Sequence, residues 1–257
     1  MVDSWVVRHP MLSQCQVRHG FFTRNGGVSV QAFTSLNCGL KTEDDPKAVQ
    51  ENRRRVAKEM GVAAECLWGA VQIHSTKVIA VKAGDKTTYE ADGAITTEPD
   101  IAISVLTADC APVLFSTPDG KMVGAAHAGW RGAAFGILEA TIDQMVSAGA
   151  KAEIITAVIG PCISAKGYEV REDMRSEVIG QDPSGTPYFA SVGEALYKFD
   201  LAGYCLHRLK RRGLIHCAAL NLDTLSNEAH FFSHRRRVLA GGGPLGLQIS
   251  SIACRKG

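Results

Sequence analysis

The chain has 257 residues, with 28 Lys and Arg against 26 Asp and Glu, and a formal net charge of +2. Hydrophobic residues make up 46% and charged residues 21%, a composition that excludes a disordered chain. The small excess of positive charge argues against binding to nucleic acid through a basic surface. The length suffices to bury a large core, and we expect residues 1–257 to form a single domain.

The N-terminus and the cysteines indicate the compartment in which the chain works. Residues Met1–Trp5 show no basic segment followed by an apolar stretch, so we expect no signal peptide. No apolar run approaches the roughly 20 residues that a membrane-spanning helix needs. We therefore predict a cytoplasmic protein without membrane contact, whose 8 Cys are reduced thiols, ligands or nucleophiles.

In chain order, the first predicted elements are a strand at 18–23, a turn at 25–27 and a helix that begins at Asp45-Pro46 and ends before Gly61. Apolar and β-branched runs then predict strands at 78–81, 101–106, 113–115, 122–127 and 154–159. Helical spacing predicts helices at 130–148, 173–179 and 201–212. Because several strands follow one another closely, we predict an α+β fold with mixed sheets in an α/β/β/α layered domain, not a doubly wound parallel sheet.

Three segments place reactive residues at the ends of predicted strands, namely 72–75 (QIHS), 107–112 (TADCAP) and 127–132 (HAGWRG). A turn at 118–120 allows the strands on either side of it to form a hairpin, which brings Cys110 and His127 together. Two interpretations remain open. An imidazole beside Cys110 makes an activated thiolate. Together with His74, the pair makes a metal site with two His, one Cys and one open position.

A series of motifs runs in order from about residue 19 to about residue 237, and its most specific members are TADC at 107–110 and HAGWRG at 127–132. The others include HGFFTR at 19–24, SLN at 35–37, ENR at 51–53, ADG at 91–93, GPCI at 160–163 and YEV at 168–170. In these motifs the chain resembles the YfiH family, which is also labelled the "polyphenol oxidase, laccase domain" or purine nucleoside phosphorylase family.

The resemblance implies a fold similar in core to the CNF toxin, which has a Cys-His deamidase site, and a zinc ion held by His74, Cys110 and His127. It also implies phosphorolysis of adenosine, inosine, guanosine and methylthioadenosine, together with deamination of adenosine. The partners would then be a purine nucleoside and phosphate, and the chain a monomer or homodimer. The same donors tolerate copper, but the 8 His include no His-x-His pair, which argues against a multicopper laccase.

The expected catalytic residues are Cys110, His127, Asp109 and Arg131. Asp109 is the first candidate to carry protons, followed by Asp92 and Glu169, and Arg131 is the first candidate to bind phosphate. The expected substrate-binding residues are Arg24, Asn37, Arg53, Asp92 and Glu169, and Arg235 is a further candidate for phosphate.

Three alternatives stay open. One is a hydrolase or amidase, including an editing factor for peptidoglycan precursors, with Cys110 as nucleophile and His127 as base. Another is a copper-dependent polyphenol oxidoreductase. The third is a non-enzymatic protein that binds a nucleotide or a precursor.

Overall fold

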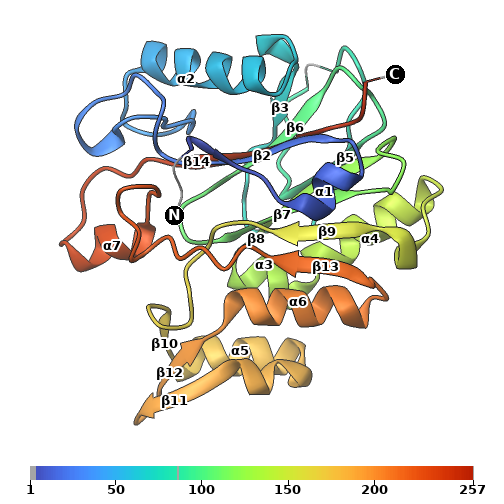
Figure 1. Cartoon of the computed structure of the whole chain (residues 1–257). Coiled ribbons are helices and arrows are strands. Elements are labelled where there is room, and N and C mark those ends of the chain that lie inside the picture. Colours follow the sequence, from blue (N-terminus) through green and yellow to red (C-terminus); the bar gives the residue numbers. More distant parts are fainter. Residues whose placement is uncertain (1–3, 86, 257) are drawn as a thin grey trace.

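The computed structural model describes residues 4–85 and 87–256. Residues 1–3, 86 and 257 lie outside the described residues, and the expectation that the chain lacks a signal peptide falls partly on the first of these. The predicted layered α+β fold is confirmed, with two large mixed sheets between layers of helices (Figure 1). In the part of the chain that is described, no helix combines the length and the apolar character needed to cross a membrane.

The first sheet has five strands, and all its neighbours pair antiparallel except β3 and β6. In spatial order they are β1 (Val6–Val7), β2 (Arg18–Phe22), β14 (Gln248–Ala253), β6 (Ala102–Thr107) and β3 (Leu67–Gly69). The C-terminal β14 was not predicted, because the polar residues Gln248, Ser250 and Ser251 interrupt its apolar pattern. All of its residues are nevertheless buried, because β14 lies inside the sheet between β2 and β6.

The second sheet has six strands, which are parallel only in the two pairs at its edges. In spatial order they are β13 (His216–Ala219), β9 (Thr156–Ile159), β7 (Ala111–Ser116), β8 (Val123–Ala128), β5 (Gly93–Thr96) and β4 (Val78–Ala80). The central strands are buried along their whole length. Such burial explains why they read as continuous apolar runs and not as alternating patterns.

The two sheets pack face to face through one apolar layer. Phe21, Ile103 and Ile252 of the first sheet meet Leu114 and Val158 of the second. Burial of such side chains is the main favourable term in folding, at roughly 25 cal/mol per Å² of apolar surface. This layer therefore fixes the two sheets, and the loops at their ends, relative to each other.

Helices cover the outer faces of both sheets. Helix α2 (Pro46–Glu59) packs on the first sheet, with Asp45 as its N-cap as the sequence predicts. Helices α3 (Trp130–Phe135), α4 (Ile137–Ser147) and α6 (Leu201–Arg211) cover the second. The prediction of one continuous helix over 130–148 is wrong. Gly136 separates α3 from α4 and adopts φ of 102°, a left-handed conformation that favours glycine.

The remaining elements are shorter. A three-stranded sheet, β10 (Glu169–Arg171), β12 (Leu196–Phe199) and β11 (Phe189–Gly193), forms the lower end of the molecule beside α5 (Glu172–Gln181) in Figure 1. The short helices are α1 (Pro10–Gln14) and α7 (His234–Leu239).

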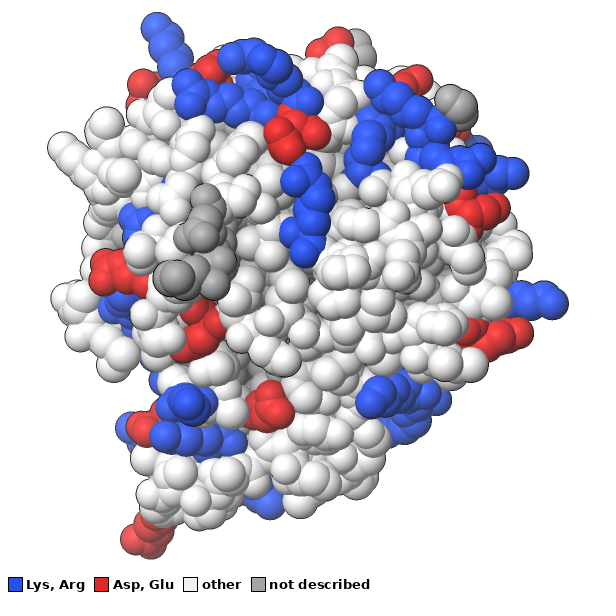
Figure 2. All heavy atoms as spheres, viewed as in Figure 1, with Lys and Arg blue, Asp and Glu red and all other residues white. Residues whose placement is uncertain are grey.

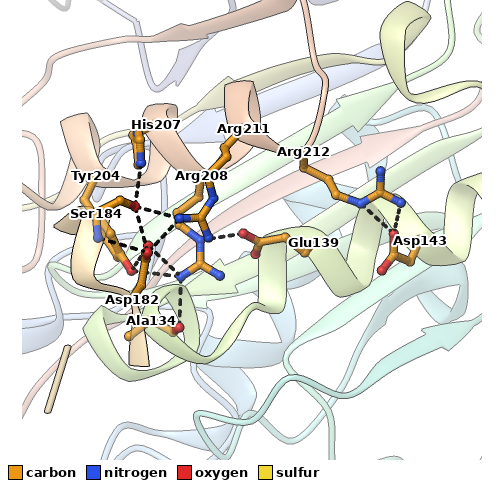
Figure 3. Close-up of polar contacts among 10 residues, drawn as sticks. All are labelled: Ala134, Glu139, Asp143, Asp182, Ser184, Tyr204, His207, Arg208, Arg211 and Arg212. Carbon is orange, nitrogen blue, oxygen red and sulfur yellow. Dashed lines mark hydrogen bonds and ion pairs between the residues drawn. The ribbon is translucent and has the colours of Figure 1, made fainter. Parts of the chain in front are cut away.

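A buried polar cluster joins α3, α4 and α6 (Figure 3). The guanidinium of Arg208 pairs with Glu139 and donates to the carbonyl of Ala134 and to the hydroxyl of Tyr204, both within 2.9 Å. Asp182 lies 3.5 Å from Arg208 and accepts a hydrogen bond from Tyr204 at 3.1 Å. Because Ala134 lies in the last turn of α3, this cluster holds the break between α3 and α4 in place.

Candidate metal centre

Hairpin pairing brings Cys110 and His127 to one end of the second sheet. Strands β7 and β8 pair antiparallel with Pro112 opposite His127, so Cys110 lies just before β7 and level with the end of β8. The predicted neighbourhood of Cys110 and His127 is therefore confirmed. His127 is 4% exposed, whereas Cys110 is half-buried at the edge of the site.

His74 arrives from a third segment, between β3 and β4. Its backbone adopts φ of 58°, a left-handed conformation that is uncommon for a residue with a Cβ atom. The rings of His74 and His127 meet edge to face with centroids 4.8 Å apart. One ligand atom from each of His74, Cys110 and His127 lies within 4.8 Å of the other two. Across residues 4–85 and 87–256, no other group of three His, Cys, Asp or Glu side chains is placed to hold a metal ion.

Asp92 connects the two histidines. Its carboxylate lies 2.8 Å from Nδ1 of His127, which leaves Nε2 as the ring nitrogen of His127 that is free for a ligand. The same carboxylate accepts hydrogen bonds from the backbone N–H groups of Ile73, His74 and Ser75, at 3.2, 3.0 and 2.6 Å. Asp92 is 1% exposed. One buried carboxylate thus orients the ring of His127 and holds the loop of His74 in its left-handed conformation.

Gly129 is the position where the backbone comes closest to the donors. A Cβ atom at this position would lie 3.0 Å from Sγ of Cys110 and 3.1 Å from Cδ2 of His74. Both contacts are tighter than ordinary van der Waals packing. A glycine after the end of β8 therefore allows the thiol and the two imidazoles to converge.

The pKa values of Cys110, His127 and Asp92 depend on one another, because these side chains are neighbours. Burial raises the pKa of the Cys110 thiol, but the neighbouring His127 and His74 outweigh burial and lower it to about 6. Burial lowers the pKa of His127, but Cys110 and Asp92 raise it to about 9. Burial also raises the pKa of Asp92, yet its hydrogen bonds from His127 and Ser75 lower it to about 2. At neutral pH the metal-free site therefore holds a thiolate, an imidazolium and a carboxylate.

Asp109 lies directly before Cys110, with φ of 88°. Its two carboxylate oxygens accept hydrogen bonds from the hydroxyls of Thr224 and Ser233 and from the backbone N–H of Arg235, at 2.6, 2.9 and 2.6 Å. The side chain therefore ties the residues that lead into α7 to the loop of Cys110.

The predicted arginines are spread over different surroundings. Arg131, on the first turn of α3, has a half-exposed side chain that lies over Trp130 and bonds to Glu177 on α5. Arg24 donates to three backbone carbonyls, those of Thr34, Glu228 and Ala32. In Figure 2 the Lys and Arg side chains gather over α2, and the middle of this face carries few charges.

Asn37 and Arg53 belong to the layer of α2, and the structure does not bring them to the donors. Asn37 is fully buried and bonds to Thr42, Asp44 and the backbone of Gly39 and Leu247. Arg53 donates to the carbonyls of Cys38 and Leu67.

Glu169 and Arg235 contact each other where β10 meets the start of α7. Glu169 lies exposed on β10, and its carbonyl accepts a bond from Arg235 at 2.9 Å. The guanidinium of Arg235 lies over the ring of Tyr168, 5.5 Å from its centroid. The sequence predicts no role for Tyr168, Thr224 or Ser233, since their proximity to the site depends on long-range contacts that no local pattern encodes.

Residues 18–255 match the family model described as multi-copper polyphenol oxidoreductase laccase. The chain belongs to this laccase-domain family, the YfiH family. The purine nucleoside phosphorylase of Deinococcus radiodurans is 35% identical over 235 residues, which cover 90% of this chain and 87% of that protein. The purine nucleoside phosphorylase YfiH of Escherichia coli K12 is 32% identical over 219 residues, 85% of this chain and 88% of that protein.

A solved member of the YfiH family confirms the fold. The crystal structure of the hypothetical protein YfiH from Bacillus licheniformis has a TM-score of 0.91 at 30% identity, and covers 99% of this chain and 98% of that one. The resemblance that the TADC and HAGWRG motifs predict is thereby confirmed over nearly the whole chain.

Proposed function

We propose that the chain is a zinc-dependent purine nucleoside phosphorylase whose metal ligands are His74, Cys110 and His127. The observation that carries the proposal is the convergence of these three side chains from three separate segments, with their ligand atoms within 4.8 Å of one another. The names of the relatives supply the reaction, since those from Deinococcus radiodurans and Escherichia coli are both named purine nucleoside phosphorylase.

The donors fit zinc in their chemistry. Two imidazole nitrogens and a thiolate are ligands that zinc prefers, and three protein ligands leave one position open. Cys110 is already a thiolate at neutral pH, so the proton that zinc binding must release is the one on the His127 imidazolium. Asp92 supplies the outer carboxylate that histidine ligands of zinc commonly have. When bound, such an ion acts as a Lewis acid and lowers the pKa of a water molecule. Copper fits the same donors.

The phosphate needs cationic hydrogen-bond donors. Among the predicted arginines, Arg131 and Arg235 have guanidinium groups that reach the surface. Arg131 lies two residues after Gly129, where an added Cβ atom would press on the donors, and in the described structure its one hydrogen-bonded side-chain partner is Glu177. Arg235 is joined to Asp109, the neighbour of Cys110, through its backbone N–H. We propose that these two guanidinium groups hold the phosphate. Arg24 and Arg53 instead bind backbone carbonyls.

The purine must gain a proton as it leaves. The carboxyl groups of Asp109, Asp92 and Glu169 differ in how far hydrogen bonds within the protein already occupy them. Three donors occupy Asp109, so we assign it the role of holding the segment before α7 beside the site. Asp92 is occupied by His127 and the loop of His74. Glu169 is exposed on β10, and we propose it for proton transfer.

The proposed substrates are adenosine, inosine, guanosine and methylthioadenosine, with deamination of adenosine as a second reaction. The test is mass spectrometry of the products formed from adenosine with and without phosphate. Adenine and ribose 1-phosphate that appear only with phosphate support phosphorolysis, and inosine supports deamination. A protein with a full complement of zinc that produces none of these contradicts the proposal.

One observation favours a second candidate function. Asp92, His127 and Cys110 form a carboxylate–imidazole–thiolate series like that of cysteine hydrolases. In that case Cys110 is a nucleophile for an amide, and His74 is dispensable. The variant H74A separates the two functions, since it abolishes a zinc-dependent reaction and preserves a hydrolase that also works in the presence of a chelator.

A further inference from the structure

The segment that carries His74 crosses from one sheet to the other. It leaves the first sheet at the end of β3, where Gly69 pairs with Ser104 of β6, and enters the second sheet at β4. Between them the backbone makes one isolated bridge, from Val71 to Glu90. His74 lies beyond this bridge and outside any strand, so strand pairing does not fix its position.

The side chain of Gln72 hydrogen-bonds to β6 beyond the point where the pairing of β3 with β6 ends. Its Oε1 accepts a hydrogen bond from the N–H of Leu106 at 2.7 Å, and its Nε2 donates to the carbonyl of Leu106 at 2.8 Å. Leu106 lies two residues beyond Ser104 on β6. The side-chain amide therefore satisfies both polar groups of Leu106 on the edge that a longer β3 would cover.

These two bonds connect the segments of two metal donors. Gln72 lies two residues before His74, and Leu106 lies on the strand that leads into the loop of Cys110. Asp92 connects His74 with His127 in the same way, through its bonds to both. The hairpin of β7 and β8 connects Cys110 with His127. Each pair among the three donors thus has its own link, and Gln72 provides the one between His74 and Cys110.

We propose that Gln72 is a positioning residue of the metal centre, which sets the separation of His74 from Cys110 before the ion binds. This inference rests on the proposed metal-dependent function. If the amide served only to satisfy the edge of β6, its loss would lower the stability of the fold and leave the metal affinity unchanged. If the amide positions His74, its loss must lower the metal affinity beyond what the loss of folding stability accounts for.

The test compares Q72M, which keeps the length of the side chain without its hydrogen bonds, with S104A. Ser104 donates from Oγ to the carbonyl of Trp68 at 2.7 Å, so S104A removes a bond between the same two strands before the chain turns toward His74. Zinc dissociation constants are measured by competition with a chelator, and unfolding of the metal-free proteins is followed in parallel. The absorption of the cobalt-substituted proteins reports the bond between the metal and Cys110.

We expect Q72M to bind zinc about 10- to 100-fold more weakly than the wild type, as for other residues that support metal ligands. Its cobalt spectrum should change as well, and S104A should match the wild type in both measurements. If Q72M does not fold, Q72N takes its place, because its amide is one methylene too short to reach both groups of Leu106.

Equal zinc affinities and spectra of Q72M and wild type, with the wild type binding zinc tightly, overturn the inference and leave the proposed function intact. A wild type that binds no zinc overturns both. An equal loss of affinity in Q72M and S104A also overturns the inference, because it would follow from weaker strand pairing alone.

Discussion

At the scale of single residues, the charge of Cys110 depends on the rings beside it. With a pKa of about 6, the Cys110 thiol of the metal-free protein is ionised at pH 7, whereas burial raises the pKa of Cys217. Only the thiolate reacts with iodoacetamide. The alkylation rate of Cys110 should therefore rise as the pH increases through about 6, while Cys217 should react only at higher pH. Mass spectrometry of labelled peptides measures both rates in one sample.

His127 is the strongest of the groups that lower this pKa. The variant H127A should move the midpoint of Cys110 alkylation upward, toward or beyond that of an ordinary thiol, and bound zinc should protect Cys110 at every pH. A midpoint that stays near 6 in H127A would show that the imidazole does not stabilise the thiolate.

Gly129 sets how closely the donors can approach. In G129A the new methyl group would press on Cys110 and His74, so we expect zinc affinity to fall by at least about tenfold with little change in unfolding temperature. Chelator competition measures the affinity. The matched control is G180A on α5, where a Cβ atom meets nothing within 4 Å. An unchanged affinity in G129A would contradict the close approach.

At the scale of elements, the buried cluster of Figure 3 holds α3, α4 and α6 together. Replacing Arg208 by Met leaves the partly buried carboxylate of Glu139 without a cation, whereas Asp182 keeps its ion pair with Arg211 at 2.6 Å. Removal of one partner from a buried ion pair costs about 3–5 kcal/mol, so R208M should lower the free energy of unfolding by at most about that amount, because Glu139 is 20% exposed. Chemical denaturation at neutral pH measures the change.

The same figure contains the control for this prediction. Arg212 pairs with Asp143 at the surface, where both side chains are at least 37% exposed. Exposed pairs are worth about 1 kcal/mol or less, so R212A should change the stability little. Equal losses in R208M and R212A would show that the buried cluster adds no stability of its own.

Elements with local signals could be predicted from the sequence, and elements without them could not. The local features are the Asp45-Pro46 cap, the turn at 118–120 and the apolar runs of β6, β7 and β8. The turn and the runs of β7 and β8 also place Cys110 beside His127. The break at Gly136 was missed because the apolar spacing continues on both sides of it. Gln72 and Asp92 act through long-range bonds to Leu106 and His127, which no pattern within either segment predicts.

At the scale of the whole molecule, the last strand completes the fold. Strand β14 lies between β2 and β6 and is the middle strand of the five-stranded sheet. A chain that ends at Leu247 would leave one edge of β2 and one edge of β6 unpaired and expose the apolar layer between the sheets. We expect this truncation to abolish cooperative thermal unfolding, as measured by circular dichroism. Removal of Lys256 and Gly257 alone should leave the transition in place, and a cooperative transition in the longer truncation would contradict the role of β14.

The proposed function depends on a metal ion that His74, Cys110 and His127 hold together. The most direct measurement is a zinc titration of the metal-free protein, with phosphorolysis of adenosine as the readout. We predict no activity in chelator, activity that rises to a plateau at about one zinc per chain, and no rise in H74A. Full phosphorolysis in the presence of the chelator, unchanged in H74A, would contradict the proposed function.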